Sequence, residues 1–165
     1  MRRKDREMDK HFALAVADKC EYAVISMAND MGMPYCVPVT IARDGQYLYF
    51  HCAKEGEKIN ILTRHPHVCV ACVGDTCRAK DKFTTAYESA IIKGTACEVK
   101  DDEEKIHALR LICERHTPTN MEHFDRAIEK SLARTGVWRI EIQQITGKHK
   151  KLRAAPGRDK RGEHL

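Results

Sequence analysis

The sequence of 165 residues predicts a mainly β (α+β) domain in which six antiparallel strands form a small barrel with peripheral helices. Three observations predict this fold class. Short segments in which apolar and polar residues alternate recur along the chain, turn-forming residues separate them, and few segments have helical spacing. A chain of this length is expected to form one domain with a core of its own.

The strands are defined by their alternation and by the residues at their ends. Asp44-Gly45 predicts a tight hairpin between the second and third strands. Pro38 has no backbone N–H to donate, so we expect its strand at a sheet edge, at a bulge or facing a ligand. Residues 74–85 are polar and irregular, which is typical of a connection that is mobile or shaped by what it binds. The expected strands cover residues 22–28, 34–43, 47–52, 67–73, 89–99 and 136–145.

The helices follow from apolar spacing and from capping residues. Phe12, Val16 and Cys20 recur at every fourth position of the first helix. The acidic run 101–104 opens a later helix and suits the positive end of its dipole. The expected helices cover residues 5–20, the segment between Gly56 and Pro66, and residues 101–117 and 121–132.

The composition is that of a soluble globular protein, with 42% hydrophobic and 32% charged residues. No apolar run approaches the ~20 residues that a membrane-spanning helix needs. The basic N-terminus has no apolar segment behind it, so it does not resemble a secretory signal. We therefore expect a cytoplasmic protein without a membrane partner.

The eight cysteines are expected to be reduced thiols, because most of them lie within apolar helix or strand patterns. Cys69 and Cys72 form a Cys-x-x-Cys sequence inside an apparent strand. Three residues along a strand span ~10 Å and place the two side chains on opposite faces, which prevents this pair from chelating a metal. No metal site is expected.

The positive charge is concentrated at the C-terminus. Residues 148–165 contain seven Lys or Arg and two Asp or Glu, which accounts for the whole net charge of +5. We expect one domain over residues 1–149 and a basic, disordered tail over residues 150–165. Nonspecific contact of the tail with nucleic acid is an alternative to a solvated tail. The neutral body and the aromatic content of 6% argue against a specific nucleic-acid partner.

The segment 47–66 carries the first functional signal. It begins as a strand and turns at residues 54–56 into a short helix. The first N–H groups of a helix have no backbone partner, and an anion fits there. Lys58 in the first turn could add a positive charge, so the segment is a candidate phosphate site. An ordinary strand-turn-helix with a solvated lysine, and a His51 that only packs in its strand, remain open from these residues alone.

Local sequence motifs, together with the order of the elements, resemble the FMN-binding split barrels. Within this group the sequence is similar to the nitroimidazole-resistance (Nim) proteins related to pyridoxamine 5′-phosphate oxidase. The resemblance covers about residues 1–150. Its motifs are Pro34-Tyr-Cys-Val-Pro-Val39, Tyr49-Phe-His-Cys-Ala-Lys-Glu-Gly-Glu-Lys58, Val73-Gly-Asp-Thr76, Lys82-Phe-Thr-Thr-Ala-Tyr-Glu-Ser89 and Ile140-Glu-Ile-Gln-Gln-Ile-Thr-Gly-Lys148.

The resemblance implies a homodimer with FMN at the subunit interface, in a cleft between the two barrels. Some of the site residues would then come from the partner subunit. The isoalloxazine would lie along Val37, Pro38 and Val39. The ring and the ribityl chain would approach His51, Cys52 and Ala53, and Lys58 would hold the phosphate. The residues that would complete the pocket are Thr84, Thr85, Tyr87, Glu88 and Ser89.

The implied activity is an FMN-dependent oxidoreductase that reduces a small electron acceptor such as a nitroaromatic. His51 matches a histidine considered reactive in some Nim proteins. The basic residues of a true pyridoxamine phosphate oxidase are missing from the second strand, which has only Arg43, and its Arg and His signature is absent after Arg139. Vitamin B6 oxidation is therefore not expected. The alternative is a non-catalytic flavin- or haem-binding module, for which nine histidines offer ligands.

Overall fold

The computed structural model describes residues 2–152, which form an antiparallel β-sheet and four α-helices. The strands follow the order β3-β2-β6-β7-β8-β5-β4, and β1 pairs with β8. Because β3 and β4 are the two edges, the sheet is curled but not closed, which is the split-barrel arrangement. The strands are β1 (Glu7–Met8), β2 (Ala23–Ala28), β3 (Pro34–Val39), β4 (Ala42–Asp44), β5 (Tyr47–Ala53), β6 (His67–Arg78), β7 (Thr85–Glu98) and β8 (Thr135–Lys150).

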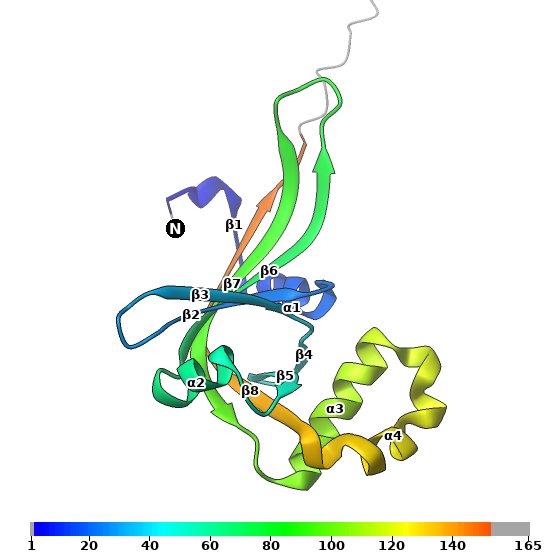
Figure 1. Cartoon of the computed structure of the whole chain (residues 1–165). Coiled ribbons are helices and arrows are strands. Elements are labelled where there is room, and N and C mark those ends of the chain that lie inside the picture. The colour runs from blue at the N-terminus through cyan, green and yellow to red at the C-terminus, as the bar shows by residue number, and fades with distance from the viewer. Residues whose placement is uncertain (1, 153–165) are drawn as a thin grey trace, which may run out of the picture.

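The helices lie around the sheet, as Figure 1 shows. Strands β6 and β7 extend beyond the barrel as a long hairpin, which we call the arm, while α3 and α4 cover the opposite end. Short 3-10 turns occupy Lys4–Arg6, Pro118–His123 and Leu132–Arg134. The α-helices are α1 (Lys10–Lys19), α2 (Glu57–Arg64), α3 (Asp102–His116) and α4 (Phe124–Ser131). Within the described residues, none of the helices has the length and apolar character that crossing a membrane requires.

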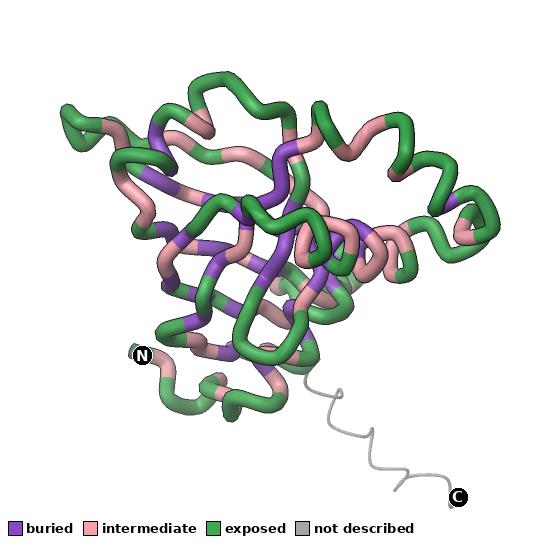
Figure 2. Tube along the Cα trace, turned by 90° about the horizontal axis from the view of Figure 1, so that it is seen from below, coloured by how far each residue is buried: buried purple, intermediate pink, exposed green. Residues whose placement is uncertain are grey.

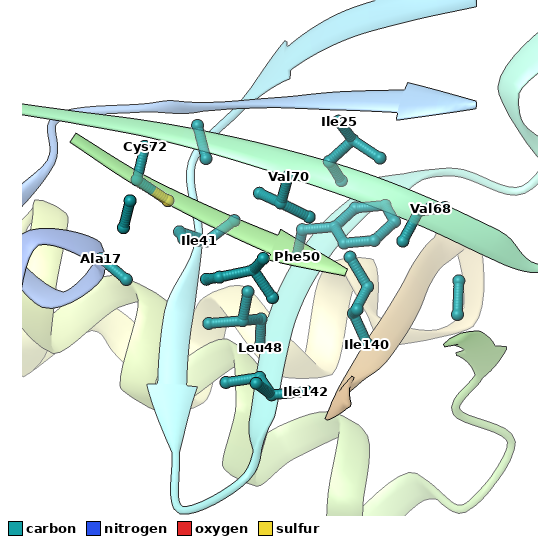
Figure 3. Close-up of a cluster of buried hydrophobic side chains, with 14 of the residues drawn as sticks. Ala17, Ile25, Ile41, Leu48, Phe50, Val68, Val70, Cys72, Ile140 and Ile142 are labelled. Carbon is teal, nitrogen blue, oxygen red and sulfur yellow. The ribbon is translucent and has the colours of Figure 1, made fainter. Parts of the chain in front are cut away.

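The main core fills the inside of the curled sheet. Alternation along β5 sends Leu48 and Phe50 inward, where both are fully buried beside Ile140 of β8 (Figure 3). Helix α1 covers this core with Ala13, Val16 and other apolar residues of its inner face. Figure 2 shows the buried stretches gathered in the middle of the molecule and the exposed stretches along its outer turns.

A second apolar cluster lies between the outer face of β5–β8 and helices α3 and α4. Tyr49 and Val137 supply the sheet side, and both are buried. The Tyr49 hydroxyl lies 3.1 Å from Glu104 Oε1, which also accepts a hydrogen bond of 2.7 Å from Arg139 Nη1. The outer side of β5 is therefore half covered, because α3 packs over Tyr49 and leaves His51 exposed.

The structure confirms the expected fold class and several local predictions. The Asp44-Gly45 hairpin joins β4 to β5, and Gly45 adopts a φ of 54°, in the left-handed region that favours glycine. Pro38 lies on the edge strand β3, opposite Val24. Cys69 is half-buried and Cys72 fully buried, as their opposite faces require. All eight cysteines lie within the described residues and are free thiols.

Several boundaries were wrong. The sheet has eight strands where six were expected, because the expected strand 34–43 is split into β3 and β4, and the two-residue β1 was missed. The expected irregular connection 74–85 is mostly strand: β6 continues to Arg78 after a register shift between Val73 and Thr76. The first helix begins at Lys10, not at residue 5.

The C-terminal boundary also differs from the expectation. Lys150, which was assigned to the tail, is the last residue of β8 and pairs with Tyr87. Residues 153–165 of the expected tail lie outside the described residues, so the tail stays a prediction.

Candidate functional site

The first half of the candidate site is the passage from β5 into α2. His51 and Ala53 are exposed on the outer side of β5, whereas Cys52 is half-buried and packs against the main core. This difference follows from the alternation along the strand, since Leu48, Phe50 and Cys52 share the inward face. Of these three predicted residues, only His51 and Ala53 present side chains outward.

The N-terminus of α2 is open to an anion. Gly56 precedes the helix with a φ of 119°, a conformation that side chains disfavour, and no side chain among the described residues caps the helix. The first helical hydrogen bond runs from Asn60 N to Gly56 O at 3.0 Å, so the amides before Asn60 have no partner within the helix. Lys58 is half-buried in this turn, with its Nζ 5.4 Å from the centre of the Phe50 ring. Its charge balances that of Glu57 in the same turn.

The electrostatics around His51 favour an anion. The pKa of His51 lies below its usual value, first because the surrounding protein desolvates the ring and then because Lys58 and His116 bring positive charge near it. A negatively charged ligand would relieve this repulsion. The imidazole is therefore neutral over a wider pH range than a free histidine.

His116 is a site residue that sequence reasoning missed. It ends α3, and its Nε2 lies 2.9 Å from the carbonyl oxygen of Ile41, which makes that nitrogen the donor. Arg115 Nη1 donates to the same carbonyl at 2.8 Å. The two side chains tie the end of α3 to the segment after β3. No sequence signal could have placed His116 beside His51, because 65 positions separate them and only the packing of α3 joins them.

The predicted residues of β3 do not share one surface. Val37 and Val39 are half-buried and pack against the main core, while Pro38 is exposed on the opposite face. Register pairing places Pro38 in an outward row with Val24, Ala71 and Ile91 across β2, β6 and β7. Val37 and Val39 therefore shape the barrel wall, and only Pro38 lies on its outer surface.

The second half of the candidate site lies on β7 and the loop before it. Thr84 is half-buried in the loop, and its hydroxyl contacts Lys150 Nζ; Thr85 is exposed at the start of β7. Glu88 is half-buried and forms an ion pair with Lys19 of α1. Ser89 is half-buried opposite Lys148.

Tyr87 lies on the arm close to two cationic side chains. Its ring centre is 5.8 Å from Lys148 Nζ. Burial raises the pKa of Tyr87, but hydrogen bonds from Arg6 and Lys148 outweigh burial, so its pKa lies below the usual value. The arm extends away from β5 and α2 (Figure 1), so one chain does not bring Thr84, Thr85 and Tyr87 to His51 and Lys58.

An uncovered apolar surface separates the two halves. Val73 of β6, Ile91 of β7 and Tyr22, which directly precedes β2, are exposed by 56%, 39% and 57%. Their rows continue through Ala71 and Val24, and in the described part of the chain no helix packs on this side. We call this surface the outward face.

The open, curled sheet with one covered and one uncovered outer side defines a split-barrel protein. The sequence profile of the pyridoxamine 5′-phosphate oxidase family matches residues 9–149, and the chain belongs to this family. None of the curated proteins compared with the sequence matches it.

Similar solved structures agree with this assignment. A protein assigned to 5-nitroimidazole antibiotic resistance from Bacteroides thetaiotaomicron is 27% identical, with a TM-score of 0.73 over 87% of this chain and 86% of that chain. The FAD and haem binding protein from Mycobacterium smegmatis is 19% identical, with a TM-score of 0.75 over 88% and 74%. The flavocytochrome Anf3 from Azotobacter vinelandii is 20% identical, with a TM-score of 0.73 over 87% and 68%. The last two, at this identity, establish the fold alone.

Proposed function

We propose that this protein binds FMN between two copies of the chain and uses it to reduce a small electron acceptor such as a nitroaromatic. The observation that carries the proposal is the uncapped N-terminus of α2, with Lys58 in its first turn and His51 beside it. A phosphate dianion would accept hydrogen bonds from the free amides and pair with the charge of Lys58. It would also offset the positive charge that lowers the pKa of His51. The 27% identity to a protein assigned to nitroimidazole resistance supports a nitroaromatic acceptor.

The outward face supports the proposed homodimer. Three large apolar side chains are exposed there, and a second copy would cover them. The same association would bring the partner's arm toward His51 and Lys58, which one chain alone does not do. Thr85, Tyr87 and Ser89 then complete the pocket from the other subunit, while Glu88 keeps its ion pair with Lys19.

The proposed role of each group in the site follows from its position. FMN, when bound, supplies the hydride or electron transfer. Lys58 and the α2 amides hold its phosphate, and Pro38 with the outward face excludes water from the ring. His51 is exposed and neutral at pH 7, so it can take up a proton near the cofactor and return it.

A second candidate is a flavin- or haem-binding module without turnover. It is favoured by the flavocytochrome and by the FAD and haem binding protein among the similar structures. An absorption spectrum of the purified protein separates the candidates: paired flavin bands support FMN binding, and a Soret band supports haem.

The test of turnover uses His51→Gln, which keeps the approximate size of the side chain but cannot carry a proton at this pH. The variant is expected to retain FMN and to reduce a nitroaromatic more slowly, with a changed pH profile. A wild-type rate with an unchanged pH profile would remove the catalytic role of His51. Absence of nitroaromatic reduction by the flavin-loaded wild-type protein, with any reductant, would favour the module.

A further inference from the structure

A large cleft lies away from the α2 site. It has a volume of about 1150 Å³ and opens between the N-terminal segment, the loop that joins β6 to β7, and the end of β8. These three segments lie together at the arm side of the molecule (Figure 1). The volume suffices for a ligand of nucleotide size. Only Thr84 of the residues expected at the flavin lines this cleft.

The lining is strongly basic. Three arginines and four lysines face two aspartates, so the excess charge of these side chains is +5. Arg3 and Arg6 share Asp5, with Arg3 Nε 2.7 Å from Oδ1 and Arg6 Nε 3.8 Å from Oδ2. Arg78 and Lys80 form no ion pair with any described residue.

Lys82 and Lys150 add to this excess. Lys82 has no ion pair within the described residues either, and Lys150 contacts only the neutral hydroxyl of Thr84. Like charges that converge from distant parts of the chain repel one another. A bound polyanion would remove this repulsion, which gives the cleft a preference for ligands with more than one negative charge.

An aromatic residue lies in the loop beside the cleft. Phe83 is the chain neighbour of two lining residues, Lys82 and Thr84; its ring is fully exposed and does not itself line the cleft. An exposed phenyl ring beside cationic groups is the combination on which bases stack while their phosphates are neutralised. The apolar side chains of Met8 and Leu152 line the same cleft.

We infer that this cleft binds a nucleoside diphosphate group, with the phosphates held by Arg78, Lys80 and Lys82 and the base stacked on Phe83. Two adjacent phosphates match a lining whose positive charges exceed its negative charges by five. A single aromatic platform matches one base. The site does not depend on the proposed flavin function, because Lys58, His51 and the α2 amides take no part in it.

The test is calorimetric titration of the full chain with adenosine, AMP and ADP. ADP is expected to bind at least about tenfold more tightly than AMP, to weaken as salt rises, and adenosine to bind weakest. Lys80→Gln/Lys82→Gln should lower ADP affinity about tenfold or more. Phe83→Ala should lower it about tenfold as well. The control Arg126→Gln/Lys130→Gln removes two exposed, unpaired charges of the described chain on α4 and should leave ADP affinity unchanged.

Two further ligands identify the source of the diphosphate. If FAD displaces ADP, and the double lysine variant weakens FAD but not FMN, the group belongs to a dinucleotide. If FAD does not compete, the ligand is a free nucleotide. Because Lys80, Lys82 and Phe83 are not among the residues proposed to hold FMN, FMN retention in these variants distinguishes failure of one site from failure of the other.

Three results would overturn the inference. One is equal affinity for adenosine and ADP, and another is unchanged ADP affinity in the double lysine variant. The third is binding of single-stranded oligonucleotides that strengthens with length while ADP does not bind, which would make the cleft part of a nucleic-acid surface. Thermal unfolding of each variant checks that the substitutions, at exposed positions of the loop and of α4, leave the fold intact.

Discussion

Lys58 gives the sharpest test of the phosphate site, because FMN and riboflavin differ only in the phosphate. Lys58→Gln keeps most of the stem that packs near Phe50 and removes the charge. A charge-assisted contact contributes about 1.5–3 kcal/mol, which corresponds to roughly a ten- to hundredfold loss of FMN affinity. The loss should stay in this range and not abolish binding, because the uncapped amides of α2 remain.

The assay is fluorescence titration of the apoprotein with both flavins. Riboflavin affinity should change less than about threefold, since the lysine contributes only a neutral contact to it. Lys54→Gln is the matched control, because Lys54 is an exposed lysine in the turn just before the helix. An equal loss for FMN and riboflavin, or an equal loss in the control, would place the phosphate elsewhere and refute the reasoning.

Three further predictions concern the outward face, a close backbone contact and a buried tyrosine. Ile91→Glu should weaken the proposed dimer and lower its FMN content together, measured by ultracentrifugation and absorbance, because it puts a charge into the face that a second copy would cover. Gly94→Ala should lower stability by about 2 kcal/mol or more in denaturant titrations, since the added Cβ would lie 2.2 Å from the carbonyl oxygen of Glu141. The pKa of Tyr49 is raised to about 12, first by burial and then by its hydrogen bond to Glu104, so the unfolded chain loses this proton first. Stability should therefore fall as pH rises from about 10 to 12, and Tyr49→Phe should remove this part of the fall.

Each of these predictions has its own control. Ile91→Val should leave the dimer intact, and a monomer that keeps full FMN affinity would rule out the shared site. For Gly94, the comparison is Gly74→Ala, whose closest contacts are the flexible side chains of Glu88 and Lys19 at 2.9 Å. If both glycine variants lose equal stability, the backbone clash is not the cause. An unchanged alkaline profile in Tyr49→Phe would assign the fall to other groups.

The parts of the fold that sequence reasoning predicted depend on local chemistry. Asp44-Gly45 specifies a hairpin by itself. Pro38 restricts its strand to a sheet edge or a bulge, because proline has no backbone N–H to donate. The inward orientation of Leu48 and Phe50 was also predictable, because a strand that is buried on one side has an apolar residue at every second position. The same alternation puts His51 on the side of the strand away from the core, and its exposure agrees.

The parts that could not be predicted depend on contacts between distant segments. The outer half of β6 is polar because the arm extends beyond the barrel into solvent, so residues 74–78 carry no burial pattern to read. Alternation along β5 puts Tyr49 on the same side of the strand as His51, yet α3 covers Tyr49 and not His51. The N-terminal strand β1 is two residues long and exists only through its pairing with β8.

The two edge strands of the sheet, β3 and β4, have a further consequence for the protein at high concentration. Exposed strand edges are templates on which other chains add strands, and this is how many β-proteins begin to form fibrils. Two of the six residues of β3 are prolines, Pro34 and Pro38, which offer no N–H for such growth. The other edge strand, β4, is three residues long and ends in Arg43 and Asp44. Arg43 contacts Asp18 of α1, and Asp44 contacts His107 of α3. Both edges are thus poor templates for ordered aggregation, and the self-association that we propose would use the outward face, where it can end at two copies.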